Sequence, residues 1–312
     1  MNIIAKYGTA LMGVLSCVLL QPSWADDFDC QDARAAPLNN NTPYYEGFYV
    51  GESGCLYDPA SINVEQVPPF LGPSGDTGRR LYFVNGANPE RRRESSKLAL
   101  LAEFADIPVV GIYNTFAGGQ LEGLIESARP QIRGASKQIA ELALAAIDRK
   151  EIFHIRGGSH GTAVISDGMG LIRDALSERL RNRPEINRVM AEFLRVETHG
   201  STVRSFPDGP QYIHYVNLLD PVPFTAGVMA VGNRPGRQAV IALFSDTIEA
   251  MEAWFMELPG FSQFLLQTHG FSAYTVYREP FDALYGEANQ RRRATRIWLP
   301  QKTETIQRPG DL

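Results

Sequence analysis

From about residue 80 onward, short apolar runs alternate with longer stretches in which apolar positions recur every three or four residues. The first pattern predicts buried strands and the second predicts amphipathic helices. Strands that alternate with helices usually pair in parallel, and helices then cover both faces of the sheet. The sequence therefore predicts an α/β fold with a mostly parallel sheet and helices on both faces. The expected strands are 81–84, 108–113, 151–156, 196–203, 212–219 and 239–244, and the expected helices are 89–105, 119–149 with a break near Pro130, 164–176, 184–195 and 246–258.

The segment before this alternation has a different composition. Residues 26–78 are rich in Asn, Pro, Gly and Tyr and poor in helix-forming residues, which is typical of loops. Short strands are expected at 47–50 and 55–57. We therefore predict a loop-rich N-terminal extension over 26–78, followed by one large α/β domain over 79–312.

The first 25 residues have the pattern of a secretory signal peptide. The positive charge of Lys6 precedes an apolar stretch over 10–20, and a small residue, Ala25, stands at the expected cleavage site. The apolar stretch is too short to span a membrane. The sequence therefore predicts export, to the periplasm or out of the cell. A lipoprotein signal at Cys17 is the alternative, but a bulky leucine stands two residues before it and the apolar run continues beyond it.

Cleavage after Ala25 leaves two cysteines, Cys30 and Cys55. An exported protein with two cysteines favours a single disulfide bond. We therefore predict a Cys30–Cys55 bridge that pins the N-terminal extension, with two free thiols as the alternative.

The charge of the chain is mildly acidic. Loss of Lys6 with the signal peptide changes the formal net charge from -5 to -6, so no attraction to nucleic acid is expected. Basic runs at 91–93 and 291–293 stand among glutamates and favour solvated helix faces; a transient contact with lipid headgroups at a membrane surface is the alternative. No metal site is predicted, because the acidic residues Asp26, Asp27, Asp29 and Asp32 lack the spacing of a calcium loop.

A G-x-S-x-G motif spans residues 157–161, with Ser159 at its centre and Gly157 and Gly161 at its ends. An apolar run precedes the motif and a helical pattern follows it. This order of strand, sharp turn and helix is typical of a nucleophile elbow, in which the flanking positions must be almost free of side chain. The alternative is an ordinary glycine turn in which Ser159 caps the helix.

A serine becomes a good nucleophile when a histidine takes its proton, and a carboxylate usually orients that histidine. In hydrolases with this elbow the chain order is Ser, then Asp or Glu, then His. Asp220 follows the best late strand, 212–219, at the end where α/β sheets place their ligands. His269 is the one histidine after Asp220. The alternatives are an Asp-Pro turn at Asp220 and a structural role for His269.

The G-x-S-x-G motif, followed by Asp220 and then His269, resembles the pattern of the α/β-hydrolase superfamily. The sequence Asp-Pro-Val-Pro at 220–223 is similar to a motif that carries the catalytic acid in its lipase-like branch. The resemblance covers about residues 80–280. It implies serine-dependent ester hydrolysis with Ser159 as nucleophile, His269 as base and Asp220 as the acid that orients the base. It implies no metal and no organic cofactor.

An oxyanion hole is expected from two backbone N–H groups. One belongs to His160, the residue after the nucleophile, and the other comes from the loop after the strand at 81–84. That loop contains Gly86, which permits an unusual backbone angle, and Ala87, whose N–H is the expected second donor. The loop lacks the His-Gly motif that many members of this superfamily carry at this position. The alternative is a turn in which Asn88 caps the next helix.

The sequence predicts an exported carboxylic-ester hydrolase, lipase-like or phospholipase-like, that acts on a lipid or a small ester. The lipid preference depends on the apolar segment 224–231, which is expected to form a wall or lid of the site or else ordinary core. Two alternative functions remain open. The same triad supports acyl transfer or deacetylation of a polysaccharide, and a hydrolase scaffold also supports a non-catalytic binding or envelope protein.

Overall fold

The computed structural model describes residues 30, 35–37, 43–52, 54–87, 91–115, 133–245, 269–288 and 294–300. The expected signal peptide, the helix expected at 246–258 and the basic run at 291–293 lie outside the described residues. So do Asn88 and the acidic residues Asp26, Asp27, Asp29 and Asp32.

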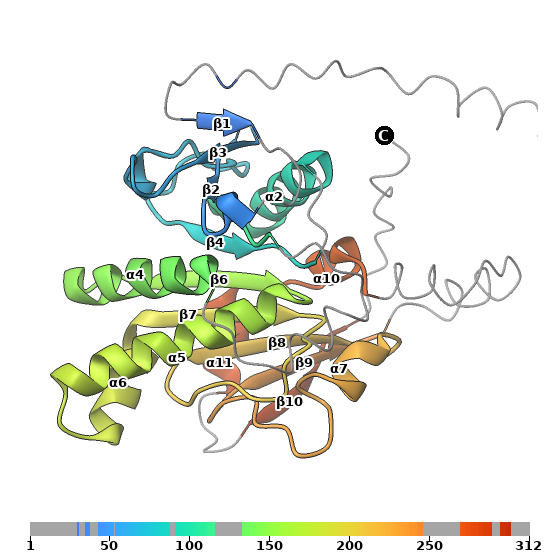
Figure 1. Ribbon diagram of the computed structural model, residues 1–312. Helices are drawn as coiled ribbons and strands as arrows, with labels where there is room; N and C mark the ends of the chain where they lie inside the picture. The colour runs from blue at the N-terminus through green and yellow to red at the C-terminus, as the bar shows by residue number, and fades with distance from the viewer. Residues whose placement is uncertain are drawn as a thin grey trace, which may run out of the picture.

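The described strands form a single sheet that is mostly parallel (Figure 1). Its parallel strands are β4 (Leu81–Val84), β5 (Val109–Ile112), β6 (Phe153–Gly158), β7 (Leu194–His199), β8 (Gln211–Asn217), β9 (Val240–Phe244) and β10 (Thr295–Trp298), and its antiparallel strands are β1 (Ala35–Pro37), β2 (Tyr49–Val50) and β3 (Cys55–Tyr57). The strand order is β1-β3-β2-β5-β4-β6-β7-β8-β9-β10. The α/β architecture expected from the alternating pattern is therefore present.

The N-terminal segment contributes strands to this same sheet. Strand β2 pairs antiparallel with β5, with Tyr49 opposite Ile112. Short helical turns, η1 (Pro43–Tyr45) and η2 (Val64–Gln66), flank the strands. The expected disulfide joins Cys30 to Cys55 of β3, with the two Cα atoms 6.0 Å apart. A segment that looks loop-rich in sequence therefore covers the edge of the sheet, because even two or three extended residues satisfy an exposed strand edge.

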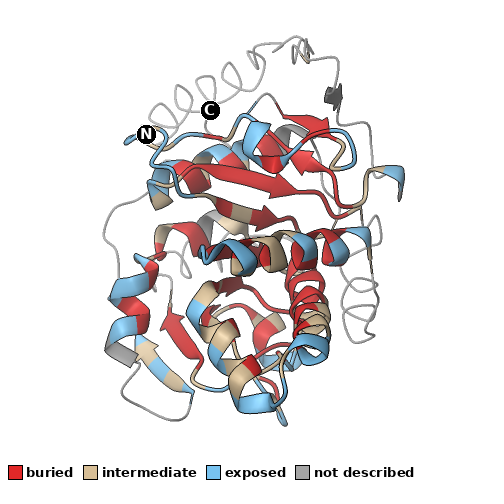
Figure 2. Cartoon of the chain, turned by 90° about the vertical axis from the view of Figure 1, so that its left-hand side faces the viewer, coloured by how far each residue is buried: buried red, intermediate tan, exposed pale blue. Residues whose placement is uncertain are grey.

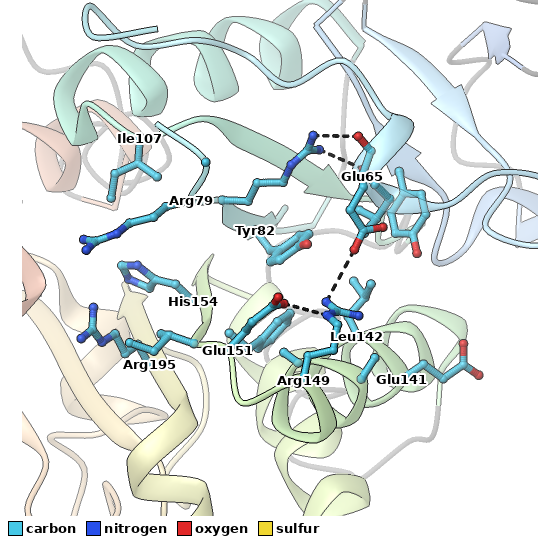
Figure 3. A pocket seen from close by; sticks show the side chains of 18 of the residues that line it. Glu65, Arg79, Tyr82, Ile107, Glu141, Leu142, Arg149, Glu151, His154 and Arg195 are labelled. Atoms are coloured by element: carbon cyan, nitrogen blue, oxygen red, sulfur yellow. Dashed lines mark hydrogen bonds and ion pairs between the residues drawn. The ribbon is translucent and has the colours of Figure 1, made fainter. Parts of the chain in front are cut away.

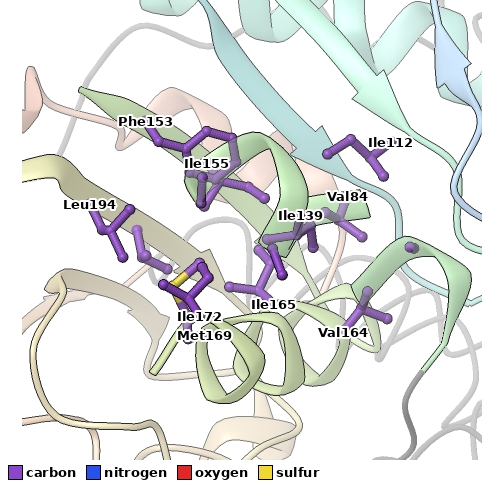
Figure 4. Packing of buried hydrophobic residues seen from close by; sticks show 14 of the residues in the cluster. Val84, Ile112, Ile139, Phe153, Ile155, Val164, Ile165, Met169, Ile172 and Leu194 are labelled. Carbon is purple, nitrogen blue, oxygen red and sulfur yellow. The ribbon is translucent and has the colours of Figure 1, made fainter. Parts of the chain in front are cut away.

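One face of the sheet packs against α4 (Gly134–Arg149) and α5 (Gly161–Arg179), with α6 (Arg183–Phe193) beside α5. Isoleucines 165 and 172 of α5 and Ile139 of α4 lie against Phe153 and Ile155 of β6 (Figure 4). Each of these side chains is at most 2% exposed. Burial of one such side chain contributes about 1.5–3 kcal/mol, so this layer is a major part of the core.

The other face packs against α2 (Arg91–Ala105), α10 (Phe271–Val276) and α11 (Phe281–Ala288). Leu81 and Phe83 of β4 contact Leu98 and Leu101 of α2, while the neighbours of Leu81 and Phe83 along β4 face α4 and α5. This alternation is what a strand buried on both faces requires. Buried residues accordingly concentrate on the strands and on the inward sides of the helices (Figure 2).

Strand β6 differs from the expected strand at 151–156. It begins at Phe153 and continues through the two glycines, because Gly157 and Gly158 pair in register with Thr198 and His199 of β7. The glycines of the motif therefore belong to the strand, and the turn begins only at Ser159.

Across the part of the chain that the structure describes, we find no helix that combines the length and the apolar character needed to cross a lipid bilayer.

The disulfide generates a stability prediction. Replacing both Cys30 and Cys55 with serine should lower the free energy of unfolding by about 3 kcal/mol, because the bond closes a loop across 25 residues and restricts the unfolded chain. Urea denaturation of the mature protein measures this change. Wild-type protein in dithiothreitol should match the double variant, and a double variant as stable as the oxidised wild type would contradict the prediction.

Candidate active site

The carboxyl ends of the parallel strands meet at one edge of the sheet, and the site residues expected from the sequence lie there. Ser159 follows β6, Gly200 follows β7, and Asp220 lies between β8 and the short helix α7 (Pro221–Thr225). His269 comes from later in the chain, just before α10. This edge is where α/β sheets bind their ligands.

Ser159 has a strained backbone. Its φ is 50°, in the left-handed region that residues other than glycine seldom adopt. Such a conformation costs about 1–3 kcal/mol and persists only where the surroundings hold it. Every residue from 153 to 165 is buried except Ser159, which is half-exposed. The strain therefore presents one side chain to solvent from an otherwise buried junction between β6 and α5.

Four hydrogen bonds hold the strained backbone. The Ser159 N–H donates to the carbonyl oxygen of His199 at 3.0 Å. The Ser159 carbonyl accepts from the Thr162 hydroxyl at 2.7 Å, from the Thr162 N–H at 3.0 Å and from the Thr202 hydroxyl at 3.2 Å. The N-cap of α5 is His160, which makes no side-chain capping bond. The turn and not a capping side chain therefore sets the position of Ser159.

Glycines around Ser159 are required by close packing. A Cβ atom on Gly161 would lie 2.6 Å from the Val84 carbonyl oxygen, and one on Gly157 would lie 2.5 Å from the end of Ile165. A Cβ atom on Gly158 would overlap the ring of His199. The sequence pattern anticipates the need at Gly157 and Gly161, but the need at Gly158 depends on a side chain from β7.

Asp220 and His269, which are 49 residues apart in sequence, are joined by a hydrogen bond. His269 Nδ1 lies 2.7 Å from Asp220 Oδ2. Asp220 is fully buried, and the other carboxylate oxygen, Oδ1, accepts from the Val222 N–H at 2.9 Å. The His269 side chain is 16% exposed. A buried carboxylate therefore orients a histidine that still reaches the surface.

Gly200 places this pair beside the elbow. A Cβ atom on Gly200 would lie 2.5 Å from His269 Cε1 and 3.4 Å from Asp220 Oδ2. Gly200 directly follows His199, whose carbonyl accepts the Ser159 N–H. The His269 ring therefore packs on the residue next to the one that is hydrogen-bonded to Ser159.

The other four histidines are buried, and burial lowers the pKa of each. The pKa of His214 falls to about 4 for this reason, and the pKa of His160 falls to about 4 through burial and the nearby charge of Arg133. Burial also lowers the pKa of His154, and it lowers that of His199 well below its ordinary value. Of the five histidines, His269 is thus the one with a carboxylate partner at the exposed edge.

The loop after β4 runs alongside Ser159, as an oxyanion hole would require. A Cβ atom on Gly86 would lie 3.2 Å from Ser159 Cβ and 3.9 Å from Ser159 Oγ. Gly86 does not adopt a left-handed φ, so its glycine is explained by this close approach and not by an unusual backbone angle. Ala87 is the next residue, and His160 stands at the amino end of α5. The two expected donors therefore belong to the residue that follows Gly86 and to the residue that follows Ser159.

Two asparagines fix this loop. Asn85 Nδ2 donates to the Asn114 carbonyl at 2.7 Å, and the Asn114 N–H donates to Asn85 Oδ1 at 2.8 Å. Asn114 Nδ2 also lies 3.0 Å from His160 Nδ1, where it donates to the neutral ring. The ends of β4, β5 and β6 are thereby tied together behind the serine.

The apolar segment 224–231 divides into buried and exposed parts. Val228 is fully buried in the core, whereas Phe224 is 37% exposed and Val231 is 95% exposed. Core packing therefore explains Val228, while Phe224 and Val231 keep exposed apolar side chains, and Phe224 lies on the helix that Asp220 caps.

A buried charge cluster lies between the sheet and α10. Glu197 Oε1 accepts from Arg278 Nη2 at 2.7 Å and from His154 Nε2 at 2.8 Å, and Glu197 Oε2 accepts from Arg278 Nε at 3.0 Å. Arg156 Nη1 lies 3.4 Å from Glu197 Oε2. Burial raises the pKa of Glu197, but the charges of Arg278 and Arg156 and the bond from His154 outweigh it, so the net shift is downward. Burial lowers the pKa of Arg156 to about 10, which leaves it charged at neutral pH.

An open cleft of about 1350 Å³ lies at the opposite, amino-terminal edge of the strands (Figure 3). Arg79, Glu151 and Arg195, near the starts of β4, β6 and β7, are among the residues that line it. Arg149 bridges Glu151 at 2.7 Å and Glu65 at 3.5 Å across one side of it. The described residues that line this cleft do not include Ser159, Asp220 or His269, so the cleft is separate from the candidate site.

No group of three or more His, Cys, Asp or Glu side chains is placed to hold a metal ion within the described ranges.

Several residues of the site have no clear signal in the sequence. Gly200, Thr202, Asn114 and Tyr274 each matter through a contact with a residue far away in the chain. Such contacts leave no local pattern that a sequence could reveal.

The glycine packing generates a second prediction. Gly161→Ala should lower the free energy of unfolding by about 2–3 kcal/mol, because the new methyl meets the rigid Val84 carbonyl. Gly157→Ala should cost about 1 kcal/mol, since it meets the flexible end of Ile165.

The matched control is Gly170→Ala in the same helix, where no atom lies within 4 Å of the added Cβ. It should raise stability by about 0.5–1 kcal/mol, because alanine favours a helix interior over glycine. Chemical denaturation gives the three values, and equal losses at positions 157 and 161 would contradict the packing argument.

Comparison with known proteins gives no relative for this chain. We found no matching protein-family model, no matching curated protein and no matching solved structure. Any assignment of function therefore depends on the geometry of the site.

Proposed function

We propose that this protein is an exported serine-dependent carboxylic-ester hydrolase, lipase-like or phospholipase-like, with Ser159, His269 and Asp220 as its catalytic triad. The observation that carries the proposal is the 2.7 Å hydrogen bond between His269 Nδ1 and Asp220 Oδ2 beside the strained backbone of Ser159. The chain order Ser, Asp, His and the elbow between β6 and α5 support membership of the α/β-hydrolase superfamily.

The geometry suits one division of labour among the three residues. Because Asp220 accepts the proton on His269 Nδ1, the neutral ring carries its lone pair on Nε2. Nε2 then takes the proton of the Ser159 hydroxyl as the Ser159 oxygen bonds to the ester carbonyl carbon. The charged imidazole formed in this step is stabilised by the buried Asp220 carboxylate.

The remaining steps complete the hydrolysis. The backbone N–H groups of His160 and Ala87 are the proposed donors to the oxyanion, and each such donor typically contributes about 3 kcal/mol. His269 returns its proton to the alcohol as the ester C–O bond breaks, which leaves an acyl-serine. Water then gives a proton to His269 and attacks the acyl carbon, and the acid departs as the proton returns to Ser159.

A lipid substrate is supported by apolar surface at the same edge of the sheet. Phe224 lies on α7, whose N-cap is Asp220, and Val231 follows in the next turn. Single exposed apolar residues are ordinary on a protein surface, so the proposal depends on the position of Phe224, on the helix that Asp220 caps. We propose that these side chains contact the acyl chain or the lipid surface.

The triad generates a prediction for activity. Ser159→Ala and His269→Ala should each lower kcat on p-nitrophenyl butyrate by a factor of about 10⁴–10⁶, and Asp220→Asn by about 10⁴. Circular dichroism checks that each variant is folded, and a competing alcohol in the assay separates hydrolysis from acyl transfer. A folded wild type that neither turns over esters nor reacts with a fluorophosphonate at Ser159 would overturn the proposed function.

The apolar surface generates a separate prediction. Replacing both Phe224 and Val231 with serine should lower activity on phospholipid vesicles about tenfold, because about 1–2 kcal/mol of apolar contact is lost. Activity on p-nitrophenyl acetate should stay near that of the wild type.

The matched control is Ile152→Ser, which removes a 49% exposed isoleucine before β6, at the opposite edge of the sheet. It should leave both activities unchanged. Equal losses of activity on vesicles and on p-nitrophenyl acetate in the Phe224 and Val231 variant would contradict a role of these side chains in lipid contact.

A further inference from the structure

Tyr274 makes a contact that the proposed mechanism does not use. Its hydroxyl donates to Asp220 Oδ2 at 2.6 Å, and His269 Nδ1 lies 2.7 Å from the same oxygen. Tyr274 is fully buried on α10, five residues after His269. The base and this tyrosine therefore belong to one short stretch of chain, and both are hydrogen-bonded to the same oxygen atom.

A buried arginine, Arg156, is hydrogen-bonded to the backbone of Tyr274. Arg156 Nη2 donates to the Tyr274 carbonyl oxygen at 3.3 Å, near the carboxyl end of α10, where carbonyl groups lack helical partners. A cation is favoured at that end of a helix. Arg156 lies on β6, three residues before Ser159, and its Nε donates to His199 Nδ1 at 3.5 Å. Strand β6, which leads into Ser159, is thus hydrogen-bonded to α10, the helix that follows His269.

The charge cluster holds Arg156 itself. Arg156 is fully buried, and Glu197 lies opposite it in the register of β6 and β7. Its guanidinium also lies over the ring of Tyr215, 5.4 Å from the centroid. A buried guanidinium requires such partners, because an unpaired one would be strongly destabilising. Its position is therefore fixed from several sides.

We propose that Tyr274 is a positioning residue for the Asp220–His269 pair and that Arg156 anchors it to the strand that bears Ser159. The inference rests on the proposed function and assigns supporting roles to two residues outside the triad. Tyr274 shares Asp220 Oδ2 with His269, so it withdraws part of the carboxylate charge from the histidine. Its loss concentrates that charge on the His269 proton and favours the protonated imidazole.

The test compares the rate of fluorophosphonate labelling of Ser159 as a function of pH in wild type, Tyr274→Phe and Arg156→Met. In Tyr274→Phe the acid limb of the profile should move up by about one pH unit, the shift expected for loss of one hydrogen bond to a charged group. Labelling should slow by about tenfold well below the midpoint of the acid limb and should be unchanged on the plateau above it. Arg156→Met should slow labelling in the same direction by severalfold, because the end of α10 loses its anchor.

Other ionisable groups near the pair do not produce this shift. His199 lies near His269, and the charges of Arg156, Lys97 and Glu197 act on His199 from β6, α2 and β7. Burial, followed by the charges of Arg156 and His269, keeps the pKa of His199 far below its ordinary value, so it stays neutral through the test. Arg156 and Glu197 keep their charges in the same range.

A proton resonance gives a readout that does not depend on activity. The proton between His269 Nδ1 and Asp220 should resonate far downfield and should disappear in His269→Ala, which assigns it. In Tyr274→Phe it should move further downfield, because Asp220 Oδ2 then has one donor fewer.

The matched control is Tyr277→Phe on the same stretch of chain. Tyr277 is 5% exposed and donates to the Ser245 carbonyl at 3.4 Å, away from Asp220. It should leave both the profile and the resonance unchanged.

The outcomes separate the two proposals. A wild type that fails to label at Ser159 overturns the proposed function, whatever the variants do. A wild type that labels, with an unmoved acid limb and an unmoved resonance in Tyr274→Phe, overturns the role of Tyr274 alone. An equal loss of labelling at every pH would mean a structural role and would also overturn it, whereas wild-type labelling by Arg156→Met would overturn the anchor.

Discussion

The common direction of the strands from β4 to β9 is the constraint on which the site depends. Because these strands pair in parallel, their carboxyl ends lie at one edge, and the residues that follow them must meet there. Ser159 after β6, Gly200 after β7 and Asp220 after β8 come together for this reason. The same direction places the separate cleft, near the starts of β4, β6 and β7, at the far edge.

The strained backbone of Ser159 and the buried charges near it destabilise the fold, and neighbouring residues offset both effects. The left-handed backbone of Ser159 is held by His199, Thr162 and Thr202, and a side chain at either flanking glycine would collide with backbone or side-chain atoms. The buried charges of Glu197 and Arg156 lie on the strands beneath α10, where they are paired. Such pairs add little net stability compared with a well-packed apolar core. Their value here is geometric, because they fix where α10 lies relative to β6.

Local patterns predicted most of the elements, because hydrophobic periodicity is a property of neighbouring residues. Strand β4 has its expected bounds, and β5, β8, β9, α2 and α6 differ from expectation by one or two residues at an end. The short elements β1, β10 and α11 were not expected, since a three- or four-residue strand or an eight-residue helix depends on its neighbours more than on its own pattern. Strand β10 pairs with β9 although its alternating residues leave Trp298 66% exposed.

The sequence by itself determined the alternation of strands and helices, the glycines at 157 and 161, and the order of Ser159, Asp220 and His269 along the chain. These are local or one-dimensional properties, so residue type and spacing suffice to reveal them. Only the tertiary structure decided that His269 meets Asp220, that Gly158 and Gly200 must leave room for histidine rings, and that Tyr274 shares Asp220 Oδ2. Each of those contacts joins residues tens of positions apart, and the sheet that brings them together exists only when the whole core is packed.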